Sequence, residues 1–166
     1  VAPQFEFHHQ DVYAPGLNPT GRADRLPFPM PNATVTLFLA WSVFTHVNER
    51  AAGFYLDELG RVLHPDGVAM TTWFLFDKSD FPMMQEFQNA LFINDVDPAN
   101  AVIFDKQWLR ASAERAGLVI AHVVLPGVRG FQWRIDLRKA RPGTRHAEYP
   151  AESSPTAVVR PAPMPA

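Results

Sequence analysis

The fold of this chain is decided by one apolar run, Thr34-Val35-Thr36-Leu37-Phe38-Leu39-Ala40-Trp41. Beyond its first residues the run is continuously apolar and rich in side chains that favour β-strands. A continuous apolar run is typical of a strand buried on both faces, as in a parallel sheet that helices cover. The run therefore predicts a central strand of an α/β sheet over residues 34–40.

The segment after this strand predicts a helix, a turn and a second buried strand. Ser42 or Thr45 is suited to cap the helix, since a hydroxyl oxygen accepts hydrogen bonds from the first free backbone N–H groups. Apolar side chains gather on one helical face, namely Phe54, Tyr55, Leu59, Val62 and Leu63. The helix is expected to stop at a turn, His64-Pro65-Asp66-Gly67. Residues 68–76 then form the second strand.

Two further helices are expected. Residues 80–92 have the composition of a helix, although Pro82 restricts where it begins. Asp105 is suited to cap the other helix, and Gly117 is suited to end it in the left-handed backbone conformation.

Strands are also expected near both ends of the chain. Apolar and polar side chains alternate over residues 4–10, residues 118–125 are apolar, and residues 131–137 alternate again and pair back antiparallel. Strands that alternate with helices indicate an α/β sheet, and ligands of such sheets bind at the carboxyl ends of the strands. Function is therefore expected at Asp11 and over residues 40–46.

The composition indicates a globular protein. The chain has 166 residues, of which 47% are hydrophobic and 19% charged, enough for a sizeable core. Fifteen basic and seventeen acidic residues give a net charge of -2, which argues against a nucleic acid or an anionic membrane as partner. The absence of cysteine excludes a disulfide scaffold, a thiolate metal site and a cysteine nucleophile, and it fits the cytoplasm. No apolar run approaches the roughly 18 residues of a membrane span.

The prolines divide the chain. Many of the sixteen prolines fall over residues 15–31 and 142–165. The second of these segments has little large and apolar beyond Tyr149, so its burial would not offset the entropy of ordering it. We therefore expect a domain over residues 1–140 and a Pro-rich disordered tail over residues 141–166.

Several short strings, in a constant order along the chain, resemble class I S-adenosylmethionine-dependent methyltransferases. Each string is weakly specific alone, and their order over residues 5–139 makes the likeness specific. The strings are His9-Gln10-Asp11-Val12-Tyr13, Asn18-Pro19-Thr20-Gly21, Leu26-Pro27-Phe28-Pro29, Ser42-Val43-Phe44-Thr45-His46-Val47, Tyr55-Leu56-Asp57-Glu58-Leu59-Gly60-Arg61-Val62-Leu63-His64-Pro65-Asp66-Gly67 and Leu137-Arg138-Lys139.

The resemblance implies a three-layer, Rossmann-like methyltransferase sheet that closes on a C-terminal antiparallel hairpin. In this likeness residues 4–10 are the third strand, residues 34–40 the fourth and residues 68–76 the fifth. The family's glycine-rich cofactor loop and first two strands should come earlier, and Gly16 and Gly21 do not follow a buried strand as that loop requires. The N-terminal strands are therefore expected to be missing, which leaves sheet edges open to self-association.

The resemblance implies that Asp11 and its neighbour Val12 contact the cofactor. In the family, an acidic residue at the tip of the third strand accepts a hydrogen bond from the adenine amino group. A carboxylate is an acceptor and the exocyclic amine is a donor, so the chemistry matches. The alternative is that Asp11 only turns the chain or caps the next segment.

Ala40, Trp41 and Ser42 correspond to the turn where the methionine part of S-adenosylmethionine meets the methyl acceptor. Ala40 lets the backbone approach a ligand, and Trp41 offers an apolar wall or a face for the sulfonium cation, unless it is a core aromatic. His46 is a candidate base because imidazole titrates near neutral pH. The alternative for His46 is a structural hydrogen bond.

No metal is expected at this turn. Some relatives hold a divalent metal there with two acidic residues and a histidine. Ser42 and Thr45 occupy the matching acidic positions, and neutral hydroxyls ligate such metals poorly.

The function that the resemblance implies is methyl transfer from S-adenosylmethionine to oxygen, nitrogen or carbon of a small molecule. The rival hypothesis is a non-catalytic α/β scaffold that binds another protein through its exposed sheet edge and the Pro-rich tail.

Overall fold

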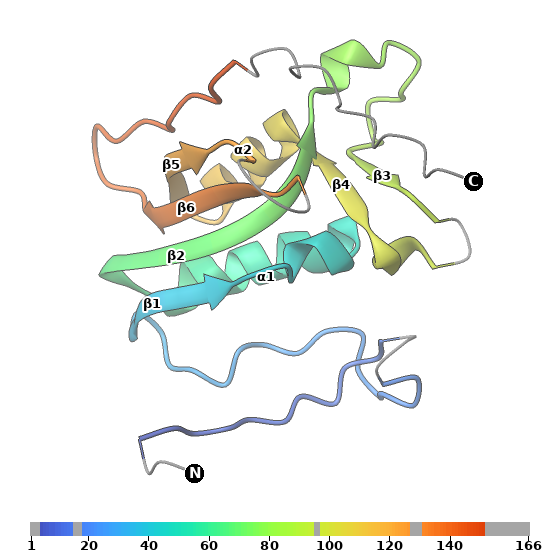
Figure 1. The fold of residues 1–166 in the computed structure, drawn as a ribbon. Helices are drawn as coiled ribbons and strands as arrows, with labels where there is room; N and C mark the ends of the chain where they lie inside the picture. The colour runs from blue at the N-terminus through green and yellow to red at the C-terminus, as the bar shows by residue number, and fades with distance from the viewer. Residues whose placement is uncertain (1–3, 15–17, 95–96, 127–130, 152–166) are drawn as a thin grey trace, which may run out of the picture.

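The computed structural model describes residues 4–14, 18–94, 97–126 and 131–151. Its mixed, six-stranded open sheet confirms the predicted α/β class (Figure 1). The strands are β1 Val35–Ala40, β2 Leu63–Phe76, β3 Ala90–Phe92, β4 Val102–Asp105, β5 Leu118–Val124 and β6 Trp133–Lys139. The α-helices are α1 Glu49–Val62 and α2 Lys106–Arg115, and single 3-10 turns cover η1 Phe44–His46, η2 Lys78–Asp80 and η3 Pro98–Asn100.

The long strand β2 is the centre of the sheet. β1 runs parallel to it and places Ala40 opposite Thr71, and β4 runs parallel to the last residues of β2, with Asp105 opposite Phe76. β6 lies between β2 and β5 and is antiparallel to both. The predicted antiparallel pair at the end of the sheet is thus confirmed, and the carboxyl ends of β1, β2 and β4 share one edge.

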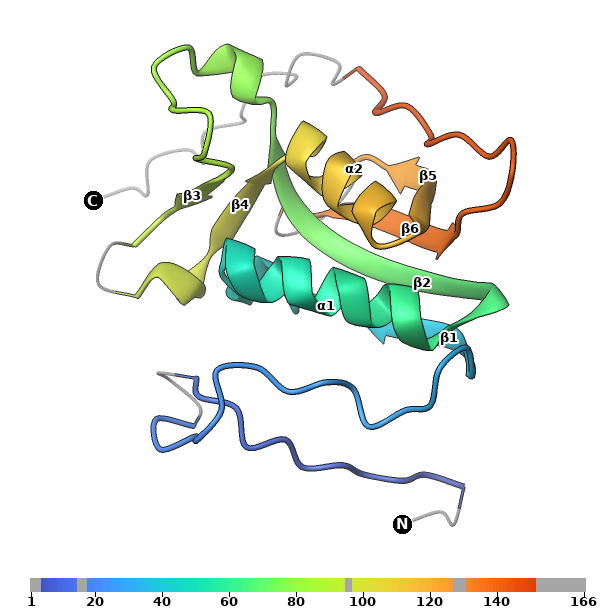
Figure 2. The same ribbon diagram turned by 180° about the vertical axis from the view of Figure 1, so that it is seen from behind.

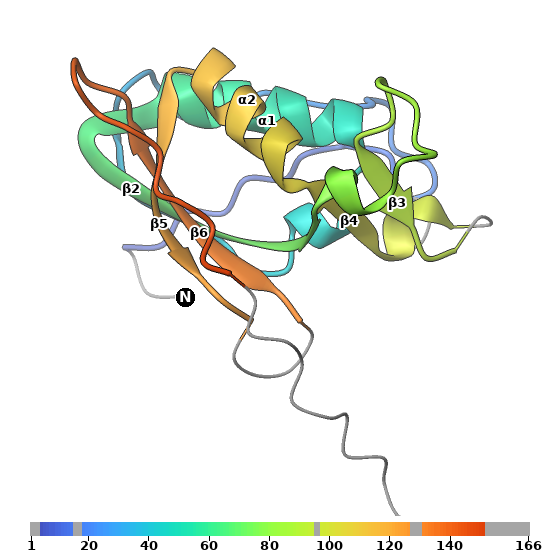
Figure 3. The ribbon, with the colours of Figure 1, turned by 90° about the horizontal axis from the view of Figure 1, so that it is seen from above.

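Both α-helices cover the same face of the sheet (Figures 2 and 3). The core lies between them and the sheet, where Trp73 stacks on Phe44 with ring centroids 4.2 Å apart and meets the edge of Phe104 at 5.3 Å. The other face carries no helix within the described residues, so these form two layers where three were expected.

The strand predicted over residues 34–40 is β1, and the prediction that it is buried on both faces is wrong. Phe38 and Ala40 turn toward the covered face, whereas Leu37 and Leu39 are 54% and 63% exposed. β1 is therefore buried on one face only, because no element of the described chain packs on the other.

The helix after β1 is capped by Asn48, whose side chain accepts a hydrogen bond from the N–H of Ala51 at 2.9 Å. The prediction of Ser42 or Thr45 as the cap is therefore wrong. Ser42 lies in a bend with φ of 56°, and Thr45 lies in the short helix η1. An amide oxygen caps as well as a hydroxyl does, so composition did not separate the three positions.

The predicted turn at residues 64–67 lies within β2 and interrupts its pairing with β1. The register moves from Val35 opposite Leu63 to Leu37 opposite Val68, so extra residues of β2 bulge out of the ladder. A Cβ at Gly67 would come within 2.6 Å of the Val35 carbonyl oxygen. The bulge therefore needs glycine at that position.

The helix predicted after Asp105 is confirmed as α2. The Asp105 side chain accepts hydrogen bonds from the N–H groups of Trp108 at 2.9 Å and of Lys78 at 3.0 Å. Gly117 follows the helix with φ of 69°, as predicted.

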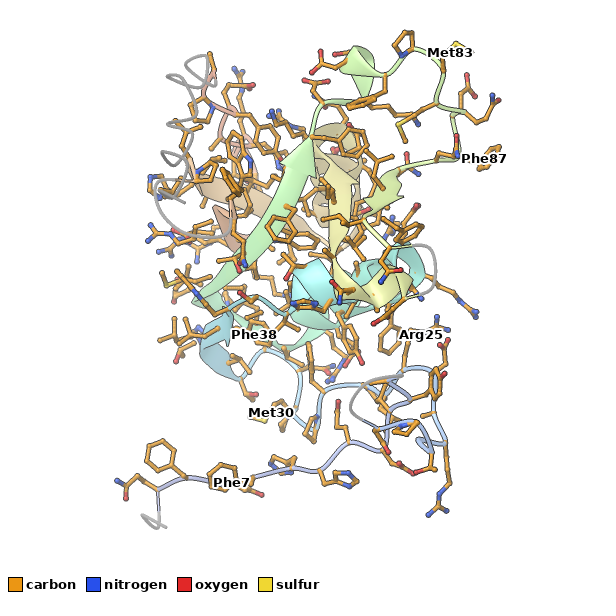
Figure 4. The ribbon with its side chains drawn as sticks, turned by 45° about the vertical axis from the view of Figure 1, so that its right-hand side comes forward. Phe7, Arg25, Met30, Phe38, Met83 and Phe87 are labelled. Atoms are coloured by element: carbon orange, nitrogen blue, oxygen red, sulfur yellow. The ribbon has the colours of Figure 1, made fainter. Side chains whose placement is uncertain are left out.

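Two predicted elements are wrong. Residues 4–10 pair with no strand of the described chain, and Phe7 lies out on this segment (Figure 4). Residues 80–92 form turns and the short strand β3, which pairs with β4. Met83 and Phe87 project from that loop and are 88% and 77% exposed. They therefore do not pack against the core.

The packed part of the chain extends past residue 140, where the domain was expected to end. Ala147 and Tyr149 pack against the core, because the large ring of Tyr149 finds an aromatic partner in Trp133. The rest of the predicted tail, residues 152–166, lies outside the described residues.

Candidate functional site

A cavity of about 280 Å³ lies at the carboxyl end of β1. Its lining includes Ala40, Val43 and Phe44 from the end of β1 and the turn after it, and Gln10 from the N-terminal segment. The remaining wall is apolar and comes from Phe28, Phe38, Leu39, Val47 and Tyr55. Gln10 directly precedes Asp11, so the two segments singled out in the sequence border one cavity.

The aromatic wall is assembled from three parts of the chain. Phe28 stacks on Tyr55 of α1 with ring centroids 5.3 Å apart, and it lies 5.3 Å from Phe38 of β1 at a tilted angle. Figure 4 shows Phe38 on the side of β1 that faces the loop carrying Met30. Burial raises the pKa of the Tyr55 hydroxyl, so this wall stays uncharged at neutral pH.

An ion pair on α1 holds Phe28 in place. The Glu58 carboxylate accepts a hydrogen bond from the Phe28 N–H at 2.8 Å and from Arg61 at 2.6 Å. Arg61 donates in turn to the carbonyl oxygens of Phe28 and Met30 at 2.9 and 2.8 Å. The Arg61 hydrogen bond lowers the pKa of Glu58, so the pair is fully ionised at neutral pH.

Asp11 does not line the cavity, although its neighbour Gln10 does, and the Asp11 carboxylate already has two partners. Oδ1 accepts from the Asn18 side chain at 3.1 Å, and Oδ2 pairs with Arg22 Nε at 3.1 Å. The side chain is 37% exposed, and a carboxylate offers about four acceptor positions. Asp11 therefore retains capacity to accept another hydrogen bond. Val12 next to it forms an isolated bridge with Ala23.

The three residues predicted to form the site at the turn after β1 have different surroundings. Ala40 is buried and lines the cavity, whereas Trp41 is 69% exposed and does not line it. Ser42 donates its N–H to Thr72 Oγ1 at 2.7 Å, and its hydroxyl oxygen accepts from Gln132 Nε2 at 2.8 Å. Ser42 thus fixes the turn to the sheet.

His46 is exposed and does not line the cavity, although its neighbour Val47 does. Its Nδ1 lies 3.1 Å from the Ala99 carbonyl oxygen, so Nδ1 carries the proton in this contact. Only Nε2 is then free to accept a proton.

Among the residues that the structure describes, no group of three or more His, Asp or Glu side chains is arranged to hold a metal ion. No helix of this described part combines the length and apolar character needed to cross a membrane.

Sequence reasoning missed most of the cavity wall. Phe28 lies in one of the strings that carried the resemblance, but nothing in the sequence pairs it with Phe38 or Tyr55. Gln10 was read as part of a strand. Because these residues come from separate segments, no local pattern links them.

No family model matches the chain. Among solved structures, it is similar to the 1,6-didemethyltoxoflavin N1-methyltransferase of Burkholderia thailandensis, solved with 1,6-didemethyltoxoflavin and S-adenosylhomocysteine, at 18% identity over 66% of this chain and a TM-score of 0.49. It is also similar to a SAM-dependent methyltransferase of Methanosarcina mazei, at 15% identity over 68% of this chain and a TM-score of 0.49. A mitomycin 7-O-methyltransferase is similar at 13% identity over 70% of this chain, with a TM-score of 0.47. The chain spans 46%, 62% and 32% of these three proteins, less than two thirds of each.

Proposed function

We propose that this chain forms part of an S-adenosylmethionine-dependent methyltransferase that acts on a small molecule. The observation that carries the proposal is the cavity where Gln10, next to Asp11, meets Ala40 and Val43. It lies at the carboxyl end of a parallel strand, where ligands of α/β sheets bind. The family strings of the sequence converge there, since Phe28, Val43 and Tyr55 all belong to them.

The residues present fit one portion of the cofactor. The cavity is at the small end of the roughly 300–1,000 Å³ that ligand pockets occupy, so it would hold part of a nucleoside-sulfonium ligand. Asp11 retains acceptor capacity for an amino group, with Val12 beside it. The buried Ala40 leaves room for close approach, and Ser42 holds that turn in place.

The chemistry needs little from the protein beyond alignment and the exclusion of water. When bound beside Gln10 and Ala40, S-adenosylmethionine would supply a methyl group on a cationic sulfur for transfer to a lone pair of the acceptor, with the sulfur retaining the bonding electron pair. The exposed ring of Trp41 is proposed to offer an aromatic face on the side where the methyl acceptor binds. His46 remains a candidate base for the acceptor proton through Nε2.

Calorimetric titration with S-adenosylhomocysteine tests the proposal. We expect saturable binding that Asp11→Ala weakens by about tenfold, because a hydrogen bond to a charged group is lost. The matched control is Asp57→Ala, which removes an exposed carboxylate that also pairs with an arginine and lies outside the cavity. It should leave binding unchanged.

The same titration separates the enzyme from the rival scaffold hypothesis. Saturable binding of S-adenosylhomocysteine supports the enzyme, whereas no binding contradicts it and leaves the scaffold.

Three further features of the protein remain proposals. The cytoplasm is the proposed location, on the ground that the sequence has no cysteine. No nucleic-acid partner is proposed, because the net charge is -2. Self-association is proposed through the edge of β1 that pairs with no strand of the described residues.

A further inference from the structure

A second and larger cavity, of about 660 Å³, lies at the carboxyl end of β2 and shares no lining residue with the first. Its lining includes Phe76 at the end of β2 and Asp77 after it, Lys106 and Arg110 of α2, and the C-terminal segment, residues 148–151. That segment contacts α2 directly, since Arg110 lies over the Tyr149 ring. One wall of this cavity therefore exists only while the segment stays in place.

The residues just before this wall are fastened to the edge strand β5. The Ala147 N–H donates to the Ile120 carbonyl oxygen at 2.7 Å. In the opposite direction, the Ile120 N–H donates to Nδ1 of His146 at 3.2 Å. Both backbone groups of Ile120 are thus satisfied by the C-terminal segment, and one of the two bonds uses an imidazole nitrogen.

Tyr149 is the second point of attachment. Its hydroxyl donates to the Lys106 carbonyl oxygen at 3.2 Å, and its ring meets the edge of Trp133 at 6.1 Å. Arg110 lies over the same ring at 5.6 Å and donates to the Ala147 carbonyl oxygen at 3.1 Å. Burial raises the pKa of Tyr149, so this attachment does not titrate near neutral pH.

His146 is therefore the attachment whose strength depends on pH. An imidazole nitrogen accepts a hydrogen bond only through a free lone pair, so protonation of Nδ1 abolishes the bond from Ile120. The added charge would also face Arg110 of α2, which already interacts with this segment. Glu114 of α2 and Glu148 of the segment face His146 as the opposing negative charges.

We propose that residues 146–149 form a pH-sensitive latch, which holds the C-terminal segment against β5 and α2 while His146 is neutral and releases the segment, and with it one wall of the 660 Å³ cavity, when His146 is protonated. The latch depends on the contacts above and is independent of the proposed methyltransferase function.

The direction of the pH effect follows from the environment of His146. Burial, and next the charge of Arg110, lower its pKa below the ordinary value of 6.5. A histidine whose pKa is lowered by folding contributes stability above 6.5, and this contribution is lost as the pH falls through the lowered value. The latch is thus closed at neutral pH and opens in acid.

Amide hydrogen exchange on the 166-residue chain tests the latch. With rates corrected for the intrinsic effect of pH, we expect protection of the Ile120 and Ala147 amides to fall about three- to tenfold from pH 7.5 to pH 5, as for one lost hydrogen bond. The Thr71 amide in the central strand is the internal reference and should keep its protection. A parallel fall at Thr71 would indicate general unfolding and overturn the proposal.

Variants isolate the imidazole. His146→Asn keeps an acceptor near the Nδ1 position but does not titrate, so its protection should be equal at both pH values. His146→Ala has no acceptor, so the Ile120 and Ala147 amides should show low protection at both pH values. The matched control is His122→Asn, at an exposed histidine of β5, the strand that carries Ile120. This variant should show the same pH-dependent fall in amide protection as the parent chain. A pH-dependent fall that persists in His146→Asn would rule the latch out.

Discussion

At the scale of single residues, Glu58 and Arg61 decide where the cavity wall lies. Phe28 precedes β1 in a segment without regular secondary structure, so its backbone groups need partners outside a helix or sheet. Glu58 takes its N–H and Arg61 takes its carbonyl oxygen. This pair on α1 therefore replaces the secondary structure that the segment lacks.

We expect Glu58→Ala to lower the free energy of unfolding by about 1–3 kcal/mol, because it leaves the Phe28 N–H and the partly buried Arg61 without their acceptor. Denaturant unfolding at pH 7 measures the change. The control is Asp57→Ala, on the same helix as Glu58, which breaks an exposed ion pair with Arg115 of α2. It should change the free energy of unfolding by no more than about 0.5 kcal/mol. Equal effects of the two substitutions would show that Glu58 does not hold the loop.

The pH dependence of this pair follows from its lowered pKa. A carboxylate whose pKa is lowered on folding stabilises the protein above its ordinary value of 4.5, and the stabilisation is lost as the pH falls below that value. Stability of the parent protein should therefore drop more steeply below pH 4.5 than that of Glu58→Ala.

At the scale of elements, the contact between α1 and the end of α2 depends on a glycine. A Cβ at Gly60 would overlap the carbonyl oxygen of Ala116, which is backbone and does not move aside easily. Gly53, two turns earlier on the same helix, faces only the end of the flexible Arg115 side chain, at 3.4 Å. The two glycines thus have different roles.

We expect Gly60→Ala to destabilise the protein by about 1–3 kcal/mol through overpacking. Gly53→Ala should instead stabilise it by about 0.5–1 kcal/mol, because alanine favours a helix interior. Thermal unfolding of the two variants measures opposite shifts of Tm. A higher Tm for Gly60→Ala would mean that the helices separate without cost.

Helices and strands with a long sequence pattern were predicted correctly, whereas predictions for short segments failed. α1, β2 and α2 carry long periodic or apolar runs, and each lies close to its predicted place. β4 has four residues and gave no recognisable signal. Residues 4–10 alternate well, yet an extended segment becomes a strand only when another strand takes its hydrogen bonds.

At the largest scale, the main feature is the side of β1 that no described element covers. Leu37 and Leu39 are exposed on it, and the outer edge of β1 pairs with no strand of the described chain. An open edge with apolar side chains is a template for pairing with another chain. The proposed self-association follows from this edge.

We expect the parent chain to self-associate with rising concentration and Leu39→Lys to reduce this association, since a lysine on an edge strand opposes pairing. Sedimentation velocity across a concentration series measures it. Phe87→Lys removes an exposed aromatic on a loop away from β1 and is the control that should associate like the parent. A parent chain that stays monomeric throughout would contradict the proposal.

Local sequence patterns predict the α/β class, the order of the main strands and helices, and the residues that cap and end α2. These features depend on side chains that are near neighbours along the chain. Packing, in contrast, brings Gln10, Phe28, Ala40 and Tyr55 to one cavity and joins His146 of the C-terminal segment to Ile120. Such contacts join distant segments, and no spacing in the sequence encodes the distance between two side chains that meet only after packing.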